Sequence, residues 1–150
     1  MMNKGFTLFI AIIVMGTLLL IAAGIVSLAI KQASISSTAR DSQQAFYAAD
    51  SGIECALYWD IQNPSGVSAF SPLTGSVINC NKDLNNPSNE WVVGGSDTSV
   101  IGPITFLPDT YCVKVTVTKE DDNTKIESLG YNTCNTSNPR RVERAVRVTY

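Results

Sequence analysis

The stretch KGFTLFIAIIVMGTLLLIAAGIVSLAIK, residues 4–31, decides how the rest of this sequence is interpreted. Residues 6–30 within it carry no charged side chain. As a helix they would extend about 37 Å at about 1.5 Å per residue, whereas the hydrocarbon core of a bilayer is about 30 Å thick. The apolar residues surround the helix instead of forming one stripe, which is typical of a segment in lipid or inside a helical bundle. The stretch therefore predicts one membrane-spanning helix.

Two common kinds of segment, a secretory signal peptide and an uncleaved membrane anchor, could also account for this apolar stretch. A secretory signal peptide has an apolar run of about 7–15 residues and a small-residue cleavage site. Small residues do occur at 22–24 and 27–29, but the apolar run is longer and continues past the first of them. A plain, uncleaved anchor would need no particular residue before the span. The junction at the start of the span separates these readings.

The junction Lys4-Gly5-Phe6-Thr7-Leu8 follows a short polar leader, MMNKG, and opens the apolar run. It resembles the class III signal of type IV prepilins and type II secretion pseudopilins. That resemblance implies that a membrane-embedded prepilin peptidase cuts after Gly5 and methylates the new amine of Phe6. The stretch QQAFYAADSGIECALYWD, residues 43–60, is similar to the corresponding helix of PilX-type minor pilins. The two resemblances together cover about the first 60 residues.

One position departs from the pattern of the family. Its major subunits carry Glu at the fifth residue after the cut, where it pairs with the N-terminal amine of a neighbouring subunit. Here that position is Ile10. A buried carboxylate is unfavourable unless it is paired, so a subunit without such a neighbour can dispense with it. The resemblance therefore favours a minor or tip subunit over a major one.

The resemblance implies a leader peptide at 1–5, a transmembrane and filament-core helix at 6–31, and a head domain at 32–150. We expect the chain to sit in the inner (cytoplasmic) membrane with one span, and then in an extracellular or periplasmic filament. The implied partners are other pilin subunits, prepilin peptidase and the pilus assembly platform, with no nucleic acid. Adhesion, motility, DNA uptake and secretion remain open as roles. The alternative is an anchored extracytoplasmic binding domain that does not polymerise.

Beyond Lys31 the sequence predicts an α+β fold, with the helix continuing to a stop at Asn63-Pro64. Alternating residues predict a strand over 111–119, a turn at 120–124, and further strands over 125–131 and 142–150. Short strands are expected at Val92-Val93 and 104–106 in a segment rich in Pro and Gly. The second half of the helix is expected to pack on this antiparallel sheet through an apolar face made of Phe46, Ala49, Ile53, Ala56, Leu57 and Ile61.

The four cysteines are Cys55, Cys80, Cys112 and Cys134, all beyond the span. An even count in an exported domain predicts two disulfides, although free buried thiols stay possible. Three pairings exist. Hairpin register about residues 120–124 favours Cys112 with Cys134, which leaves Cys55 with Cys80.

The composition argues against an enzyme, a cofactor and a metal site. The chain has no His and a net charge of −2, which removes the usual His-dependent nucleophilic sites and every His-containing zinc site. Asp50-Ser51-Gly52 matches an aspartic-protease signature, but such enzymes need two of these motifs on loops. Residues 81–85 resemble the start of a calcium-binding loop, yet Asn86 stands where Gly is required. A solvated turn is the expected structure there.

A basic cluster near the end of the sequence consists of Arg140, Arg141, Arg144 and Arg147. Contact with the phosphates of nucleic acid is one possible use of such a cluster. No aromatic residues interleave with these arginines, and ion pairs with Asp and Glu on neighbouring strands or subunits are the expected arrangement.

Overall fold

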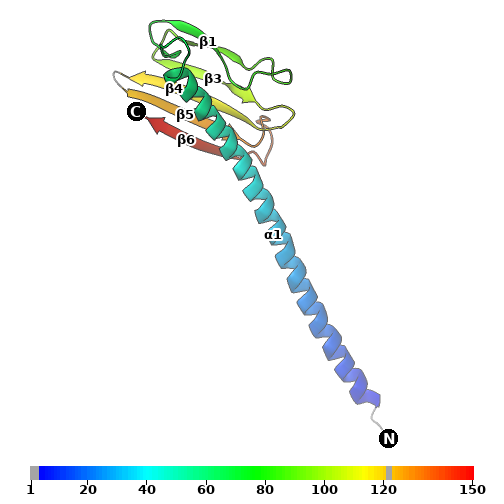
Figure 1. The fold of residues 1–150 in the computed structure, drawn as a ribbon. Coiled ribbons are helices and arrows are strands. Elements are labelled where there is room, and N and C mark those ends of the chain that lie inside the picture. The colour runs from blue at the N-terminus through cyan, green and yellow to red at the C-terminus, as the bar shows by residue number, and fades with distance from the viewer. Residues whose placement is uncertain (1–3, 121–122) are drawn as a thin grey trace. The chain divides into compact units, whose positions relative to one another are not determined.

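The computed structural model describes residues 4–120 and 123–150. One long helix is followed by six strands (Figure 1). Their bounds are α1 (Lys4–Ile61), β1 (Gly75–Asn79), β2 (Glu90–Gly94), β3 (Thr98–Thr105), β4 (Cys112–Glu120), β5 (Asn123–Tyr131) and β6 (Glu143–Thr149). The chain is therefore α+β, with an apolar helix first and an antiparallel sheet after it, as the sequence predicts.

The chain divides into two compact units, residues 1–39 and residues 40–150. The described part of the first unit is the apolar half of α1, and its side chains from Gly5 onward are exposed. Within the described residues, α1 is the one helix that is long and apolar enough to cross a membrane. We refer to the second unit, residues 40–150, as the head.

The head contains a four-stranded antiparallel sheet in the order β3-β4-β5-β6 and a two-stranded sheet of β1 and β2. The β4–β5 hairpin is regular from Cys112 paired with Tyr131 to Glu120 paired with Asn123. The expected turn at 120–124 includes residues 121–122, which lie outside the described residues. Between β3 and β4 the register shifts between Ile101 and Ile104, where Gly102-Pro103 interrupts the ladder because proline has no N–H to donate.

The core of the head lies between one face of the four-stranded sheet and α1 (Figure 1). Alternate residues of β4 point into it, and Val113, Val115 and Val117 are at most 1% exposed. Ile126 of β5 and Ile101 of β3 are fully buried beside them. The period-two pattern that predicts these strands is thus the pattern of their burial.

The predicted apolar face of the helix is confirmed for Ala49, Ile53, Ala56 and the partly buried Leu57, and it is wrong for Phe46 and Ile61. Ala45, Ala48, Ala49, Ile53 and Ala56 are buried, whereas Phe46 is 48% and Ile61 64% exposed. A Cβ atom on Gly130 of β5 would overlap backbone atoms of Ala45 and Ala49. Around Gly130 the helix backbone lies so close to β5 that no large side chain fits between them. Periodicity alone cannot show how close two elements approach.

The segment between α1 and β3 is more ordered than its Pro and Gly content indicates. The expected strand at Val92-Val93 is part of β2, and Ile104 and Thr105 are part of β3. β1 was not expected from the sequence, and it pairs with β2 from Gly75 opposite Gly94 to Asn79 opposite Glu90. Only Ile78 of β1 is fully buried, so the strand leaves little trace as a hydrophobic pattern.

Candidate processing and assembly site

The junction that resembles a processing site lies at the start of α1. Gly5 is in the first helical turn and Phe6 is 66% exposed. A Cβ atom added to Gly5 would meet no atom within 4 Å, so nothing in the fold requires glycine at this position. Residues 1–3 of the leader lie outside the described residues. A glycine that the fold does not require can be kept because a peptidase recognises it.

The apolar half of α1 presents its side chains on every side. Phe9, Met15, Leu20 and Leu28 are all more than 60% exposed, and the helix contains an 18-residue window of mean hydropathy 2.8. Ile10, at the position where major subunits carry Glu, is 45% exposed. In water this surface would be strongly unfavourable, at about 25 cal/mol per Å² of apolar area. It requires lipid or other helices around it.

Two disulfides fasten the head, and they join the pairs that the sequence favours. Cys55 of α1 is bonded to Cys80 after β1, with 5.9 Å between their Cα atoms. Cys112 at the start of β4 is bonded to Cys134 in the loop after β5, with 5.6 Å between Cα atoms. The first bridge ties the end of the helix to the β1–β2 sheet, and the second ties the loop before β6 to the central strand.

Among the described residues, no buried side-chain nitrogen or oxygen at the helix–sheet contact lacks a hydrogen-bond partner. The hydroxyl of Ser128, which is fully buried, donates to the carbonyl oxygen of Ala49 at 2.7 Å.

A Cβ atom on Gly52 would lie 2.8 Å from a methyl group of Val113 and of Val115. Gly52 is the glycine of the Asp50-Ser51-Gly52 triplet, so its role is close packing inside a helix. The two preceding side chains are exposed, and this triplet forms no catalytic loop.

A buried ion pair joins the C-terminal end of α1 to the far ends of β4 and β5. Lys119 Nζ lies 2.7 and 2.8 Å from the two carboxylate oxygens of Asp60, whose side chain is 3% exposed. The hydroxyls of Ser68 and Tyr150 donate to the same carboxylate. Lys119 also donates to Thr124 Oγ1 at 2.7 Å. We call these five residues the Asp60 cluster.

The pKa values of the Asp60 cluster follow from these contacts. Burial alone raises the pKa of Asp60, but the hydrogen bonds from Lys119, Ser68 and Tyr150 and the charge of Lys119 outweigh it, so its pKa lies below the usual value. Burial and the neighbouring Asp60 carboxylate raise the pKa of Tyr150. Asp60 is therefore ionised and Tyr150 neutral at physiological pH. The cluster is not evident from the sequence, because its members are scattered from residue 60 to residue 150.

The loop that resembles the start of a calcium site uses its carboxylate internally. Asp83 Oδ1 accepts hydrogen bonds from the backbone N–H groups of Asn85 and Asn86, both at 2.8 Å. The side-chain amide of Asn86 donates to the same oxygen, and these bonds lower the pKa of Asp83. Glu90 forms an ion pair with Lys82. The loop is a turn closed by its own hydrogen bonds, in agreement with the expected solvated turn.

Two fully paired asparagines hold this loop against the end of β3. Asn89 accepts from the N–H of Thr105 at 3.1 Å and donates to the carbonyl oxygen of Thr105 at 2.8 Å. Asn86 accepts from the N–H of Leu107 at 2.9 Å. Both asparagines are at most 2% exposed. Their side-chain amides make hydrogen bonds to backbone groups that have no strand partner in this irregular segment.

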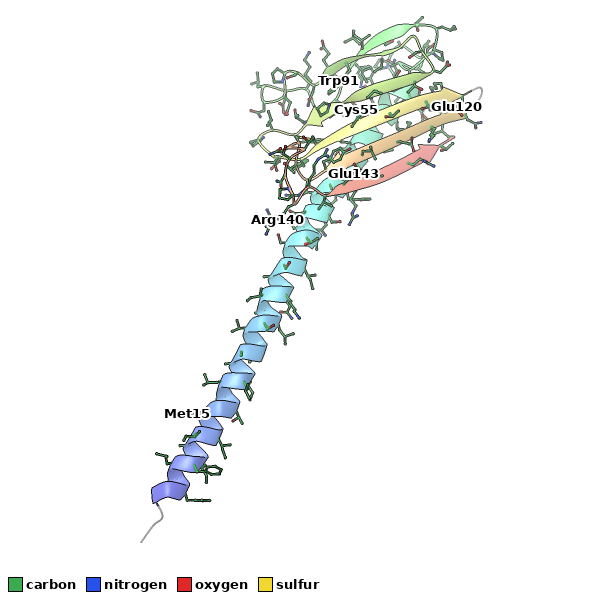
Figure 2. All side chains as sticks on the ribbon, turned by 180° about the vertical axis from the view of Figure 1, so that it is seen from behind. Met15, Cys55, Trp91, Glu120, Arg140 and Glu143 are labelled. Carbon is green, nitrogen blue, oxygen red and sulfur yellow. A yellow bond between two sulfur atoms is a disulfide. The ribbon has the colours of Figure 1, made fainter. Side chains whose placement is uncertain are left out.

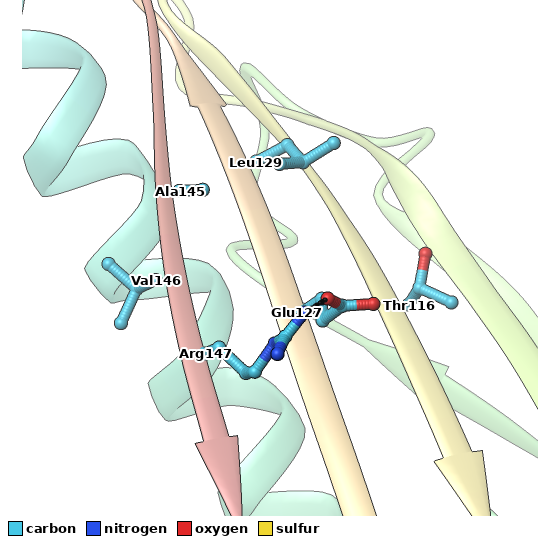
Figure 3. Close-up of a pocket in the computed structure, with 6 residues that line it drawn as sticks. All are labelled: Thr116, Glu127, Leu129, Ala145, Val146 and Arg147. Carbon is cyan, nitrogen blue, oxygen red and sulfur yellow. Dashed lines mark hydrogen bonds and ion pairs between the residues drawn. The ribbon is translucent and has the colours of Figure 1, made fainter.

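The basic cluster splits into one paired arginine and three others. Arg147 of β6 reaches across the outer face of the sheet to Glu127 of β5, with Nη2 2.6 Å from the carboxylate (Figure 3). Lys125 pairs with the same carboxylate at 3.0 Å, and both partners lower the pKa of Glu127. The expected ion pair is thus present for Arg147. Arg140, Arg141 and Arg144 form no ion pair with any carboxylate in the described ranges.

Comparison with known proteins bears on the N-terminal third of the chain. Residues 4–54 match the family model described as PilX N-terminal. This match makes the N-terminal third of the chain similar to the same part of PilX-type minor pilins of the type IV pilin family, and so supports that family for the chain. The comparisons with curated proteins and with solved structures found no match.

The matched segment shows which features of the chain are similar to those of the family. It contains the Gly5-Phe6 junction, the whole apolar half of α1 and the small-residue contact up to Gly52. The pilin family is structural, and its members assemble with other pilus subunits. The single apolar helix and the family together indicate membrane anchoring. The sheet, both disulfide loops and the arginines lie beyond the match.

Proposed function

We propose that this chain is a minor subunit of a type IV pilus or related pseudopilus, cut after Gly5, methylated on Phe6 and assembled into an extracytoplasmic filament. The observation that carries the proposal is the PilX N-terminal match, which spans the junction and the apolar helix together. Such a helix cannot stay in water, and a bundle of like helices is the environment that a filament supplies.

In this proposal the subunit first resides in the membrane through residues 6–31, with the head on the outer side. An assembly platform then lifts it into the filament. The apolar surface passes from lipid to neighbouring helices, so the change in hydrophobic free energy is small. Gly16, Ala22, Ala23 and Gly24 offer places where helix backbones can approach closely, as small residues do in membrane helices. The proposal includes no catalytic role.

We infer the place of this subunit in the filament from Ile10, which lies where major subunits carry Glu. A subunit without the fifth-position Glu has no carboxylate to neutralise the methylated amine of its neighbour. Repeating such a subunit along a filament would leave an unpaired charge at every step, which is unfavourable in a dry core. We therefore assign the chain a minor or tip position in preference to that of the repeating subunit.

Shearing of surface filaments from cells that carry a pilus assembly platform tests assembly directly. The wild-type chain is expected in the sheared filament fraction, in small amounts relative to a major subunit. The Gly5→Ala variant is expected to remain with the membranes. A wild-type chain that stays wholly in the membrane fraction would indicate the anchored, non-polymerising binding domain instead.

A further inference from the structure

Three arginines at one end of the head have guanidinium groups that no carboxylate neutralises in the described part of the chain. They are Arg140 and Arg141 in the loop before β6 and Arg144 in β6, and we call them the arginine triplet. By contrast, Lys82, Lys119, Lys125 and Arg147 are all paired with Asp or Glu. Of the other basic side chains in the described head, Arg40 and Lys114 are the two that form no ion pair.

The backbone that carries the triplet is held firmly in place. Asn132 is 8% exposed, donates to the carbonyl oxygen of Arg140 at 3.1 Å and accepts from the N–H of Val142 at 2.7 Å. The side chain of Asn138 accepts from the N–H of Arg140 at 2.9 Å. The disulfide of Cys134 closes the same loop. A fixed backbone presents these charges at a lower entropy cost than a mobile tail would.

The side chains of the triplet keep N–H groups available for a ligand. Arg141 stacks over the ring of Tyr131 at 3.7 Å and donates from Nε to the carbonyl oxygen of Thr133. Arg144 donates from Nε to Ser42 Oγ at 2.8 Å. In both contacts the Nε atom is used and the terminal Nη groups remain. Arg140 is exposed and makes its hydrogen bonds through its backbone.

The triplet lies at the end of the head where its helix begins. Arg144 contacts Ser42, which is only two residues after Arg40, the first residue of the head. Figure 2 shows Arg140 and Glu143 at this end, and Glu120 at the opposite end of the sheet. Arg40 is exposed and adds a fourth positive charge at this level of the helix, against Asp41 and Glu143. Nine positions along the sequence separate Lys31, where the apolar run ends, from Arg40.

We propose that, while the subunit is anchored before assembly, the arginine triplet and Arg40 dock on the phosphate groups of anionic membrane phospholipids. This inference rests on the proposed membrane-anchored state of the subunit. The planar guanidinium fork matches phosphate geometry and is weakly hydrated. The head otherwise repels an anionic surface, since residues 40–150 contain nine basic and thirteen acidic side chains. Among the described residues of the head, this end holds four of the five basic side chains that form no ion pair, so it is the end that favours an anionic surface.

Membrane phosphate explains the arrangement better than nucleic acid does. The nine positions from Lys31 to Arg40 span about 14 Å as a helix, so the first residue of the head is tethered close to the end of the apolar run. Nucleic acid would have to be met from solution by a head of net negative charge, and long-range steering would oppose that encounter. One face of the Tyr131 ring beside Arg141 is covered by that guanidinium and is closed to a stacking base.

The test is the rate at which phenylglyoxal labels each arginine in the full chain, followed by peptide mass spectrometry. The chain is reconstituted in nanodiscs of phosphatidylcholine alone or mixed with phosphatidylglycerol. Arg147 serves as the internal control, because it lies on the same strand but is paired with Glu127. Protease protection of residues 6–31 reports insertion separately.

In the anionic discs Arg140 and Arg144 are expected to react about fivefold more slowly than in neutral discs, which corresponds to about 1 kcal/mol per arginine at such a surface. Arg147 should be unchanged. The slowing should disappear at 1 M salt, where the Debye length is about 3 Å. The variant Arg140→Gln should reduce the protection of Arg144, whereas Arg147→Gln should not.

Equal rates in both lipids with an inserted span would overturn docking and leave the proposed function standing. A span that fails to insert would contradict both. Slowing of Arg147 to the same degree would also overturn docking, because it would reflect a general effect of the lipid. Protection of Arg140 by duplex DNA in neutral discs, without protection by anionic lipid, would replace the membrane with nucleic acid as the ligand.

Discussion

At the scale of single residues, Asp60 is the side chain whose charge matters most to the head. Its carboxylate accepts four hydrogen bonds, two of them from Lys119. Removing one partner of a buried pair leaves the other charge without compensation. We expect Asp60→Asn to lower the free energy of unfolding of the head by about 2–3 kcal/mol, as measured by urea denaturation. Asp50→Asn, at an exposed site on the same helix, should change it by less than about 0.5 kcal/mol.

The same carboxylate predicts how stability depends on acid. Because the pKa of Asp60 is lowered in the folded head, its contribution is present above the unfolded value, about 3.9, and is lost as pH falls through the folded value. The wild-type head should therefore lose stability more steeply than Asp60→Asn below about pH 4. Parallel curves for the two proteins in that range would show that the cluster is not a charged pair in solution.

Gly130 marks the closest approach of helix and sheet. A methyl group there would overlap backbone atoms of Ala45 and Ala49, which cannot move without displacing the helix. We expect Gly130→Ala to lower the unfolding free energy by about 3 kcal/mol or more. Gly75→Ala is the control, because a Cβ atom there has no neighbour closer than 3.9 Å. If both variants melt like the wild type, the helix does not lie against the sheet in this way.

At the scale of elements, much of the secondary structure could be predicted, because the hydrophobic periodicity and the positions of the helix-ending residues are clear in the sequence. The stop of α1 before Asn63-Pro64 and the strands β4, β5 and β6 are marked by proline and by alternation. The approach distance of α1 could not be predicted, since a face of alanines carries a weak hydrophobic signal. β1 was missed because only one of its residues is fully buried. The Asp60 cluster and the unpaired arginines depend on tertiary contacts that no local pattern encodes.

The two disulfides should each stabilise the element that they fasten. The bridges span 25 and 22 positions of the sequence, and in the chain-entropy model each contributes about 3 kcal/mol. Replacing Cys55 and Cys80 together by Ala should lower the free energy of unfolding by about that amount in urea. Reducing agent should then produce only the further loss due to Cys112 and Cys134. An unchanged midpoint in the double variant would contradict a fastening role for the first bridge.

At the scale of the whole molecule, the division at Arg40 predicts what can be isolated. The head has its own core, both disulfides and its own part of α1. We expect residues 40–150 to fold cooperatively in water, whereas residues 63–150 alone should not, because the core around Val115 and Ile126 would be uncovered. Circular dichroism during thermal unfolding distinguishes the two. A cooperative transition in the shorter fragment would show that the helix is dispensable to the head.

The account rests most directly on the processing of the N-terminus, and intact-mass and N-terminal analysis of the chain coexpressed with a prepilin peptidase measures it. The predicted result is loss of the five leader residues and a methylated Phe6, both abolished in Gly5→Ala. A full-length N-terminus beside an active peptidase would contradict the account and leave an anchored domain. A cut near Ala23 or Ala29 would contradict it as well, because the apolar helix would then be a signal peptide.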